Sequence, residues 1–158
     1  MATVRASRTI AAPARALWEV VADPHHLPRW WPRVTRVEDV DKTAFTEVMS
    51  TAKGKLVRAD FELLRSDEHE LVLRWAQRVQ GTPFERVLRS AETELRLTPL
   101  AGAADGGTLE SQADATLVTL ELRQVMNGFF ARFGSLMVRR AALATLEQAL
   151  DGLERIGA

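Results

Sequence analysis

Apolar and charged residues alternate with a period of two through most of the chain between residues 35 and 117. Such alternation is typical of β-strands that bury one face and expose the other. Parallel neighbouring strands need connections of about a dozen residues or more, so the short links here predict an antiparallel sheet. One face of this sheet should be exposed to solvent and the other buried. The predicted strands, each bounded by turn residues, are residues 35–40, 44–50, 55–65, 70–79, 84–98 and 108–117.

The period of the hydrophobic pattern changes at both ends of this region. Residues 3–10 alternate as a first strand, after which Pro13 opens a short predicted helix that ends at Asp23-Pro24. Near the C-terminus, leucines recur at three-, four- and seven-residue intervals, which predicts a long amphipathic helix that ends near Gly157. The stripe comprises Leu136, Leu143, Leu146, Leu150 and Leu153, and it continues backward through Phe133, Phe129, Met126 and Leu122, with a kink or break at Gly134-Ser135.

The composition excludes several classes of protein. The 158 residues fit one domain, which we expect to span residues 1–158. The 21 basic and 21 acidic residues balance, so no net field attracts nucleic acid or anionic lipid. The absence of cysteine excludes a disulfide scaffold, a thiolate zinc site and a cysteine nucleophile. No stretch without a charged residue exceeds 8 residues, so we expect no membrane span and a cytoplasmic protein.

No sequence motif for nucleotide or metal chemistry occurs, and we expect neither a cofactor nor a metal. His25 and His26 are interpreted as a solvated surface pair, because adjacent side chains seldom point to one site and no further ligand has zinc spacing.

The predicted elements leave a space between them. A twisted sheet of about seven strands curls, and one helix roughly 10 Å across cannot fill the resulting concavity. Apolar side chains line both surfaces. This arrangement predicts a pocket for an apolar small molecule.

The order of several segments resembles that of a known family. They are Ile10-Ala11-Ala12-Pro13 before a helix with Leu17-Trp18, then Asp23-Pro24, the proline- and tryptophan-rich residues 27–32, a Gly106-Gly107-Thr108 hairpin and the long terminal helix. Over nearly the whole chain, this order resembles the START-like polyketide cyclase/dehydrase group of the SRPBCC superfamily. The resemblance implies an α+β helix-grip fold, in which a curved antiparallel sheet wraps around the C-terminal helix and leaves a hydrophobic cavity.

Members of that group bind lipids, polyketides, sterols, plant hormones or ubiquinone-like molecules, and some catalyse aromatisation or cyclisation. The resemblance therefore implies that the chain carries or sequesters a hydrophobic small molecule or lipid. Two alternatives are a cofactor-independent polyketide cyclase or aromatase, and a protein-interaction module such as a chaperone activator. The chain lacks tyrosine, whereas the cyclases it resembles usually place hydroxyl-bearing and arginine side chains in the cavity. A monomer and a homodimer both remain open.

The predicted pocket has a mouth, a polar end and an apolar wall. Trp30 or Trp31 forms the mouth, although this pair also fits plain packing against the first helix or contact with a membrane surface. Gln77 joins Arg89 at the polar end, or lies at a solvated strand end. The wall comprises Phe61, Trp75, Val87, Phe129, Phe133, Leu136 and Met137.

Arg89 has two alternative orientations. If residues 84–98 keep a single register, Arg89 shares the inward face with Val87 and Ala91. A bulge near Ser90 instead turns Leu88 inward and Arg89 to water. The sequence leaves both alternatives open.

Overall fold

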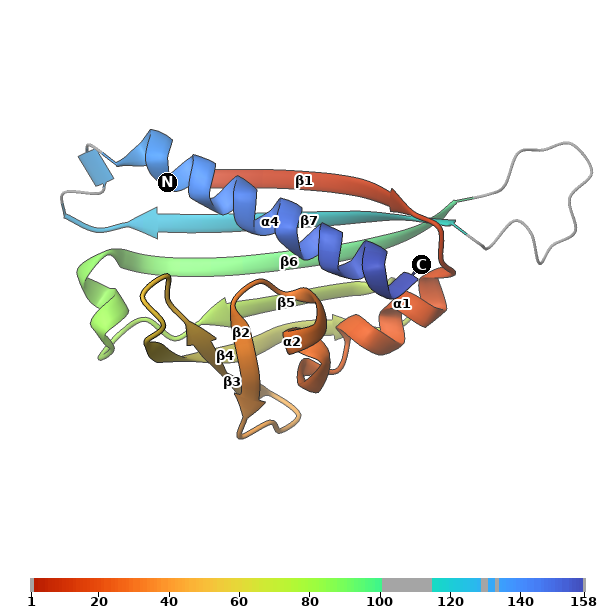
Figure 1. Cartoon of the computed structure of the whole chain (residues 1–158), viewed down its shortest axis with the longest axis horizontal. Helices are drawn as coiled ribbons and strands as arrows, with labels where there is room; N and C mark the ends of the chain where they lie inside the picture. The colour runs from red at the N-terminus through yellow and green to blue at the C-terminus, as the bar shows by residue number, and fades with distance from the viewer. Residues whose placement is uncertain (1, 101–114, 129–130, 133, 158) are drawn as a thin grey trace, which may run out of the picture.

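Seven strands form one antiparallel sheet in the computed structural model, which describes residues 2–100, 115–128, 131–132 and 134–157. The strand order is β1-β7-β6-β5-β4-β3-β2, and a long helix runs obliquely across one face of the sheet (Figure 1). The predicted α+β helix-grip architecture is confirmed. The strands are β1 (Ala2–Ile10), β2 (Val34–Glu38), β3 (Ala44–Ser50), β4 (Leu56–Asp67), β5 (Val72–Gln77), β6 (Leu88–Leu100) and β7 (Ala115–Met126). The helices are α1 (Ala14–Val21), α2 (Leu27–Trp30) and α4 (Ser135–Gly157), with 3-10 turns η1 (Pro24–His26) and η2 (Pro83–Arg86).

The strand predictions agree best where the alternation is regular. The strand predicted at residues 44–50 has the same bounds as β3. The strand predicted at residues 84–98 is wrong at its start, because η2 occupies this position and β6 begins at Leu88. Pro83 opens η2, where its missing N–H needs no acceptor and its fixed φ suits a helical turn. Part of the strand predicted at residues 108–117 lies outside the described residues.

The backward extension of the C-terminal helical stripe is wrong at two residues. Leu122 and Met126 belong to β7, where Leu122 lies opposite Val4 and Thr93, and Met126 lies opposite Leu88. Residues four apart share a face in a strand as well as in a helix, so their spacing alone does not separate the two structures. The helix begins at Ser135, at the predicted break.

The face of α4 that packs against the rest of the protein differs from the predicted leucine stripe. Leu146, Leu150 and Leu153 are fully buried as expected, but Leu143 is exposed and Ala142 and Ala149 are buried instead. The alanines allow the helix to approach its neighbours closely, which rotates the buried face away from Leu143.

A close approach between α4 and α2 depends on one glycine. A Cβ atom added at Gly152 would lie 2.4 Å from the carbonyl oxygen of Trp30, and also against the Trp30 backbone. This separation is far below van der Waals contact, so any other residue at position 152 requires α2 or α4 to move. Gly152 therefore sets the position of Trp30 over the sheet.

An ion-pair cluster joins α4 to β1. Arg8 lies on the face of β1 that α4 covers, and its Nη2 donates to Glu147 at 2.7 Å while its Nη1 donates to Glu154 at 3.0 Å and to Asp151. The Arg8 side chain is partly buried, with 24% of its surface exposed. Hydrogen bonds from the guanidinium to Asp151, Glu154 and Glu147 raise the pKa of Arg8, against the opposing effect of burial.

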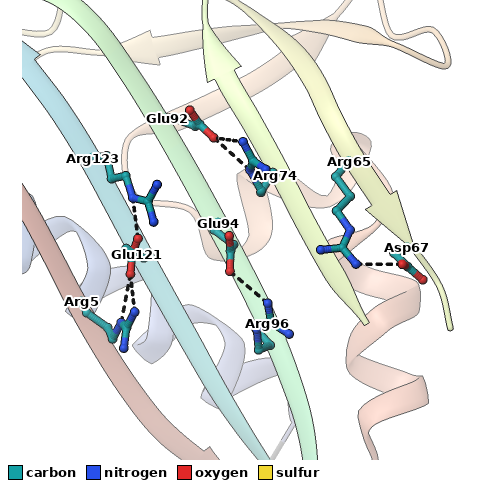
Figure 2. A network of polar contacts seen from close by, with 9 residues as sticks. All are labelled: Arg5, Arg65, Asp67, Arg74, Glu92, Glu94, Arg96, Glu121 and Arg123. Carbon is teal, nitrogen blue, oxygen red and sulfur yellow. Dashed lines mark hydrogen bonds and ion pairs between the residues drawn. The ribbon is translucent and has the colours of Figure 1, made fainter. Parts of the chain in front are cut away.

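The opposite face of the sheet is charged, as the alternation predicts. Figure 2 shows its ion pairs, two of which, Arg5–Glu121 and Arg74–Glu92, link neighbouring strands. Glu121 in β7 accepts from Arg5 in β1 at 2.5 Å and from Arg123 in its own strand at 2.7 Å. The hydrogen bond from Arg5 is the main cause of the lowered pKa of Glu121, to which Arg123 also contributes. The other pairs in this view are Arg96–Glu94 and Arg65–Asp67. We call this the outer face, and the face that α1, α2 and α4 cover the inner face.

Candidate functional site

Aromatic rings from three adjacent strands gather on the inner face of the sheet. Phe45 in β3 lies directly opposite Phe61 in β4, and the two rings stack with centroids 5.3 Å apart and planes 7° apart. Trp75 follows on β5, opposite Leu63. This inner-face cluster contains the predicted wall residues Phe61 and Trp75.

The two adjacent tryptophans occupy different positions. Trp30 is 2% exposed and belongs to the core, so the prediction of plain packing describes this ring. Trp31 is partly buried and meets Trp30 and Trp75 edge-on, with ring centroids 5.5 and 5.9 Å apart. Trp31 also borders a polar surface groove of about 340 Å³ between the α2 region and α4. Trp31 therefore stands between the core and the surface.

A small apolar cavity lies beside Trp30 and Trp75. Its volume is about 20 Å³, and Trp30, Phe45 and Trp75 line it together with Leu63, Leu73 and residues from the α1–α2 region. A space of this size holds about one water molecule. A ligand of several carbon atoms therefore requires this cavity to expand.

Gln77 places a polar group among the aromatic side chains. It lies directly opposite Phe61 on the inner face, and its side-chain nitrogen Nε2 is buried without a hydrogen-bond partner among the described residues. A buried donor without an acceptor costs about 1–3 kcal/mol. An amide in this state can orient a ligand that offers it an acceptor, which is the role that the sequence predicts for Gln77.

Glu47 is a site residue that the sequence analysis missed. It lies on β3 between Phe45 and Met49 on the inner face, and only 2% of its surface is exposed. Its burial disfavours the charged form and raises its pKa to about 8. The alternation along residues 44–50 was the available signal, because it puts a carboxyl at an inward position between two apolar ones.

Arg89 has the outward orientation predicted for a bulge near Ser90. The register between β6 and β7 shifts between Leu88 and Ser90, which leaves Leu88 buried and Arg89 exposed. The backbone carbonyl of Arg89 accepts a hydrogen bond from Gln80 at 3.0 Å. The prediction that Arg89 points inward is therefore wrong, and Arg89 does not lie with Gln77 at a polar end of the site. Val87 lies between η2 and β6 and is partly buried.

The predicted wall also differs at the start of α4. Leu136 and Met137 are 64% and 61% exposed, so neither side chain packs against the sheet. The buried face of α4 begins with Ala142, because the helix meets β1, β7 and α2 mainly through its later turns. Phe129 and Phe133 lie outside the described residues.

His25 and His26 both lie close to Asp23 near the surface. The Nδ1 atom of His25 is 2.8 Å from an Asp23 carboxylate oxygen, and the His25 ring is exposed. Among the described residues, no group of three or more histidine, aspartate or glutamate side chains is placed to hold a metal ion. None of the helices in the described part of the chain is long and apolar enough to cross a membrane.

Comparisons with known proteins give a family and a set of similar folds. The family model described as "Polyketide cyclase / dehydrase and lipid transport" matches residues 1–156. None of the curated proteins matches the sequence.

Several solved structures share the fold at low sequence identity. A START superfamily protein from Mycobacterium smegmatis is 17% identical, with a TM-score of 0.71 over 96% of this chain and 94% of its own. The Zhui aromatase/cyclase from a Streptomyces species is 18% identical, with a TM-score of 0.68 over 99% of this chain and 90% of its own. A protein from Thermus thermophilus is 24% identical, with a TM-score of 0.73 over 99% of this chain and 97% of its own.

Proposed function

Because the chain belongs to the polyketide cyclase / dehydrase and lipid transport family, we propose that it binds a hydrophobic small molecule or lipid on the inner face of its sheet. The observation that carries this proposal is the side-chain amide nitrogen of Gln77, which is buried without a partner among the described residues in a strand position directly opposite Phe61. A ligand that offers one acceptor to this amide removes the cost of leaving it unpaired.

Most of the binding free energy would come from burial of ligand hydrocarbon. Each Å² of apolar surface removed from water contributes about 25 cal/mol before the costs of association are subtracted. Phe45, Phe61 and Trp75 provide the apolar surface, and Gln77 sets the orientation. This division of roles is common in small-molecule sites, where a few polar groups lie in an otherwise apolar pocket.

We propose Trp31 as the lid of this site. The cavity of about 20 Å³ must expand before a ligand can enter. Trp30 lines both the cavity and the surface groove, and Trp31 is the partly exposed ring that borders the groove and contacts Trp30 and Trp75. Rotation of Trp31 away from Trp30 and Trp75 would uncover these two rings, which line the cavity, on the side of the groove. The aromatic contacts that hold it are worth about 0.5–1.5 kcal/mol each, which binding of an apolar ligand can offset.

The direct test is a titration of ¹⁵N-labelled protein with 2-isopropenylnaphthalene, an uncharged apolar probe. We expect shifts in the indole N–H signals of Trp30, Trp31 and Trp75 and in the side-chain amide of Gln77, whereas Trp18 in α1 serves as an internal control. Binding confined to the exposed Leu136 and Met137 region would instead support an interaction surface. No change in any of these signals would contradict the proposed site.

Gln77→Leu tests whether the Gln77 amide forms a hydrogen bond that orients the ligand. The matched control is Gln80→Leu, because Gln80 is exposed and its amide already donates to the Arg89 carbonyl. We expect Gln77→Leu to change which apolar molecules co-purify with the protein from its own host, as read by native mass spectrometry, and Gln80→Leu to leave them unchanged. An identical set from both variants would remove Gln77 from the site.

A second candidate function is a polyketide cyclase-type reaction, which the family description includes. The buried Glu47 favours it, since an uncharged carboxylic acid can polarise a carbonyl in an apolar site. Incubation with a poly-β-ketone and product analysis tests this candidate. Cyclised product at the same rate with and without the protein would exclude it for that substrate.

A further inference from the structure

We infer that Glu47, as an uncharged acid, donates a hydrogen bond to an uncharged acceptor of the bound ligand, such as a ketone or ester oxygen. This inference rests on the proposed function, because it assigns a specificity-determining residue to the same inner-face site. Its basis is the position of the carboxyl group and the kind of polar groups that share the site with it.

Glu47 has apolar neighbours on both adjacent strands. Val37 of β2 and Ala59 of β4 lie directly opposite it, and Phe45 and Met49 flank it along β3. The small side chain of Ala59 provides little cover for the longer Glu47. Among the contacts of the described residues, Glu47 makes neither a hydrogen bond nor an ion pair, so its polar atoms remain available.

The charged residues of the adjacent strands point to the other side of the sheet. Glu38 is already paired with Arg36 and Arg58, at 2.7 and 2.5 Å, on the outer face. Asp60 accepts a hydrogen bond from the Thr46 hydroxyl on that same face. No cation of β2 or β4 therefore faces Glu47, and its burial alone raises its pKa to about 8. Near neutral pH the group is mainly the protonated acid, which has an O–H donor.

The other unpaired polar atoms at this site are also donors. The indole nitrogen of Trp30 and the amide nitrogen of Gln77 are both buried without a partner among the described residues. Trp30 lines the small cavity with Phe45, the neighbour of Glu47 on the inner face. Three donors without acceptors favour a ligand with several acceptor oxygens. A cationic amine would suit an ionised Glu47 but would leave the other two donors unpaired.

The spacing of Glu47 and Gln77 suits one small molecule. Phe61 lies opposite both Phe45 and Gln77, so Gln77 is two strands across and two residues along from Glu47. With strands about 4.8 Å apart and a rise of about 3.4 Å per residue, their Cα atoms are roughly 12 Å apart in a flat sheet. Two side chains that extend from these positions can reach opposite ends of a ring system of one or two rings.

The test compares two probes that differ in the group at a single position. 2-Acetylnaphthalene has a carbonyl oxygen where 2-isopropenylnaphthalene has a methylene group, so their shapes are closely matched. Affinities for both are measured by ligand-detected NMR near pH 6.5, with the wild type, Glu47→Met, Glu47→Gln and Glu62→Gln. Glu62 is the control, because it is an exposed carboxylate on the outer face of β4.

We expect the wild type and Glu62→Gln to prefer the ketone by about 3- to 10-fold, which is the range for one added hydrogen bond. Glu47→Met should lose this preference while it keeps affinity for the hydrocarbon, and Glu47→Gln should retain part of it through its amide donor. An unchanged preference in Glu47→Met overturns the inference and leaves the proposed function standing. No binding of either probe by the wild type overturns the proposed site itself.

Infrared spectroscopy supplies a second readout, in which the response to the probes is measured on the wild type. The carbonyl band of the protonated Glu47 is identified by its absence from Glu47→Gln. We expect this band to shift when 2-acetylnaphthalene is added to the wild type and to shift less with 2-isopropenylnaphthalene. A band that responds equally to both probes, or no protonated band near pH 6.5, overturns the inference.

Discussion

The ring of Trp31 meets the ring of Trp75 edge-on, with centroids 5.9 Å apart and planes at 74°. Trp75 is fixed in β5 and buried, whereas Trp31 follows the short helix α2 and is partly exposed. The contact therefore joins a rigid strand to a short connecting segment. Trp31 thus contacts the buried Trp75 while it also borders the surface groove.

Trp31→Ala is expected to lower the free energy of unfolding by about 2–3 kcal/mol, since it removes two edge-to-face contacts and a partly buried ring. It should also speed the association of 2-isopropenylnaphthalene, as measured by stopped-flow fluorescence, because the proposed lid is gone. Trp31→Phe should show smaller changes in both quantities. Slower association in Trp31→Ala would indicate that the ring is part of the wall rather than a lid.

Glu47→Gln is expected to flatten the dependence of stability on pH. The pKa of Glu47 is about 8 in the folded protein and near 4.5 when unfolded, so between these values the folded state holds a proton that the unfolded state has lost. Wild-type stability should therefore fall as pH rises, by up to about 1.4 kcal/mol per pH unit. Urea unfolding at pH 5, 6, 7 and 8 measures this effect. From pH 5 to pH 8, the free energy of unfolding of the variant should rise by roughly 3 kcal/mol relative to that of the wild type. Parallel profiles for the two proteins would show that Glu47 is ionised in the folded state.

Gly152→Ala is expected to destabilise the protein by about 2 kcal/mol, although alanine favours helices by about 1 kcal/mol over glycine. The added Cβ would meet the backbone of Trp30, so α2 must shift. Urea unfolding measures the loss, and tryptophan fluorescence of the folded variant reports the shift. Ala144→Gly, at an exposed position of α4, is the control and should cost only the helix propensity. A Gly152→Ala variant as stable as the wild type would rule out the close contact.

Arg8→Met is expected to cost about 1 kcal/mol, because it leaves Glu147, Asp151 and Glu154 close together without their cation. The loss should become smaller in 1 M salt, which screens the repulsion among the three acids. Arg15→Met is the matched control, since Arg15 and its partner Glu68 are both highly exposed. Equal losses from the two variants in urea unfolding would contradict a specific role for the β1–α4 cluster.

Regular alternation made the sheet predictable from the sequence. The strand at residues 44–50, the apolar and charged faces of the sheet and the long C-terminal helix all follow from hydrophobic period, and the structure confirms them. The resemblance of the N-terminal segments to the START-like polyketide cyclase/dehydrase group is confirmed by the family match across residues 1–156.

The site was less predictable, because it depends on departures from regular period. A single bulged residue turned Arg89 outward, and no local residue type marks that bulge in the sequence. The buried face of α4 depends on how closely Ala142 and Ala149 approach the sheet, which leucine spacing does not encode. Glu47 was detectable in principle, but a carboxyl at an inward position contradicts the usual preference of strands for apolar residues there.

The pairing of β1 with β7 has a consequence for the order of folding. Ala2 lies opposite Gln124 and Ile10 opposite Thr116, so β1 is an edge strand whose neighbour is separated from it by more than 100 residues of chain. During synthesis, β1 leaves the ribosome more than 100 residues before β7, so it has to wait for β7 before its backbone is paired. Such a high contact order favours slow folding and leaves β1 open to wrong partners until β7 has been synthesised.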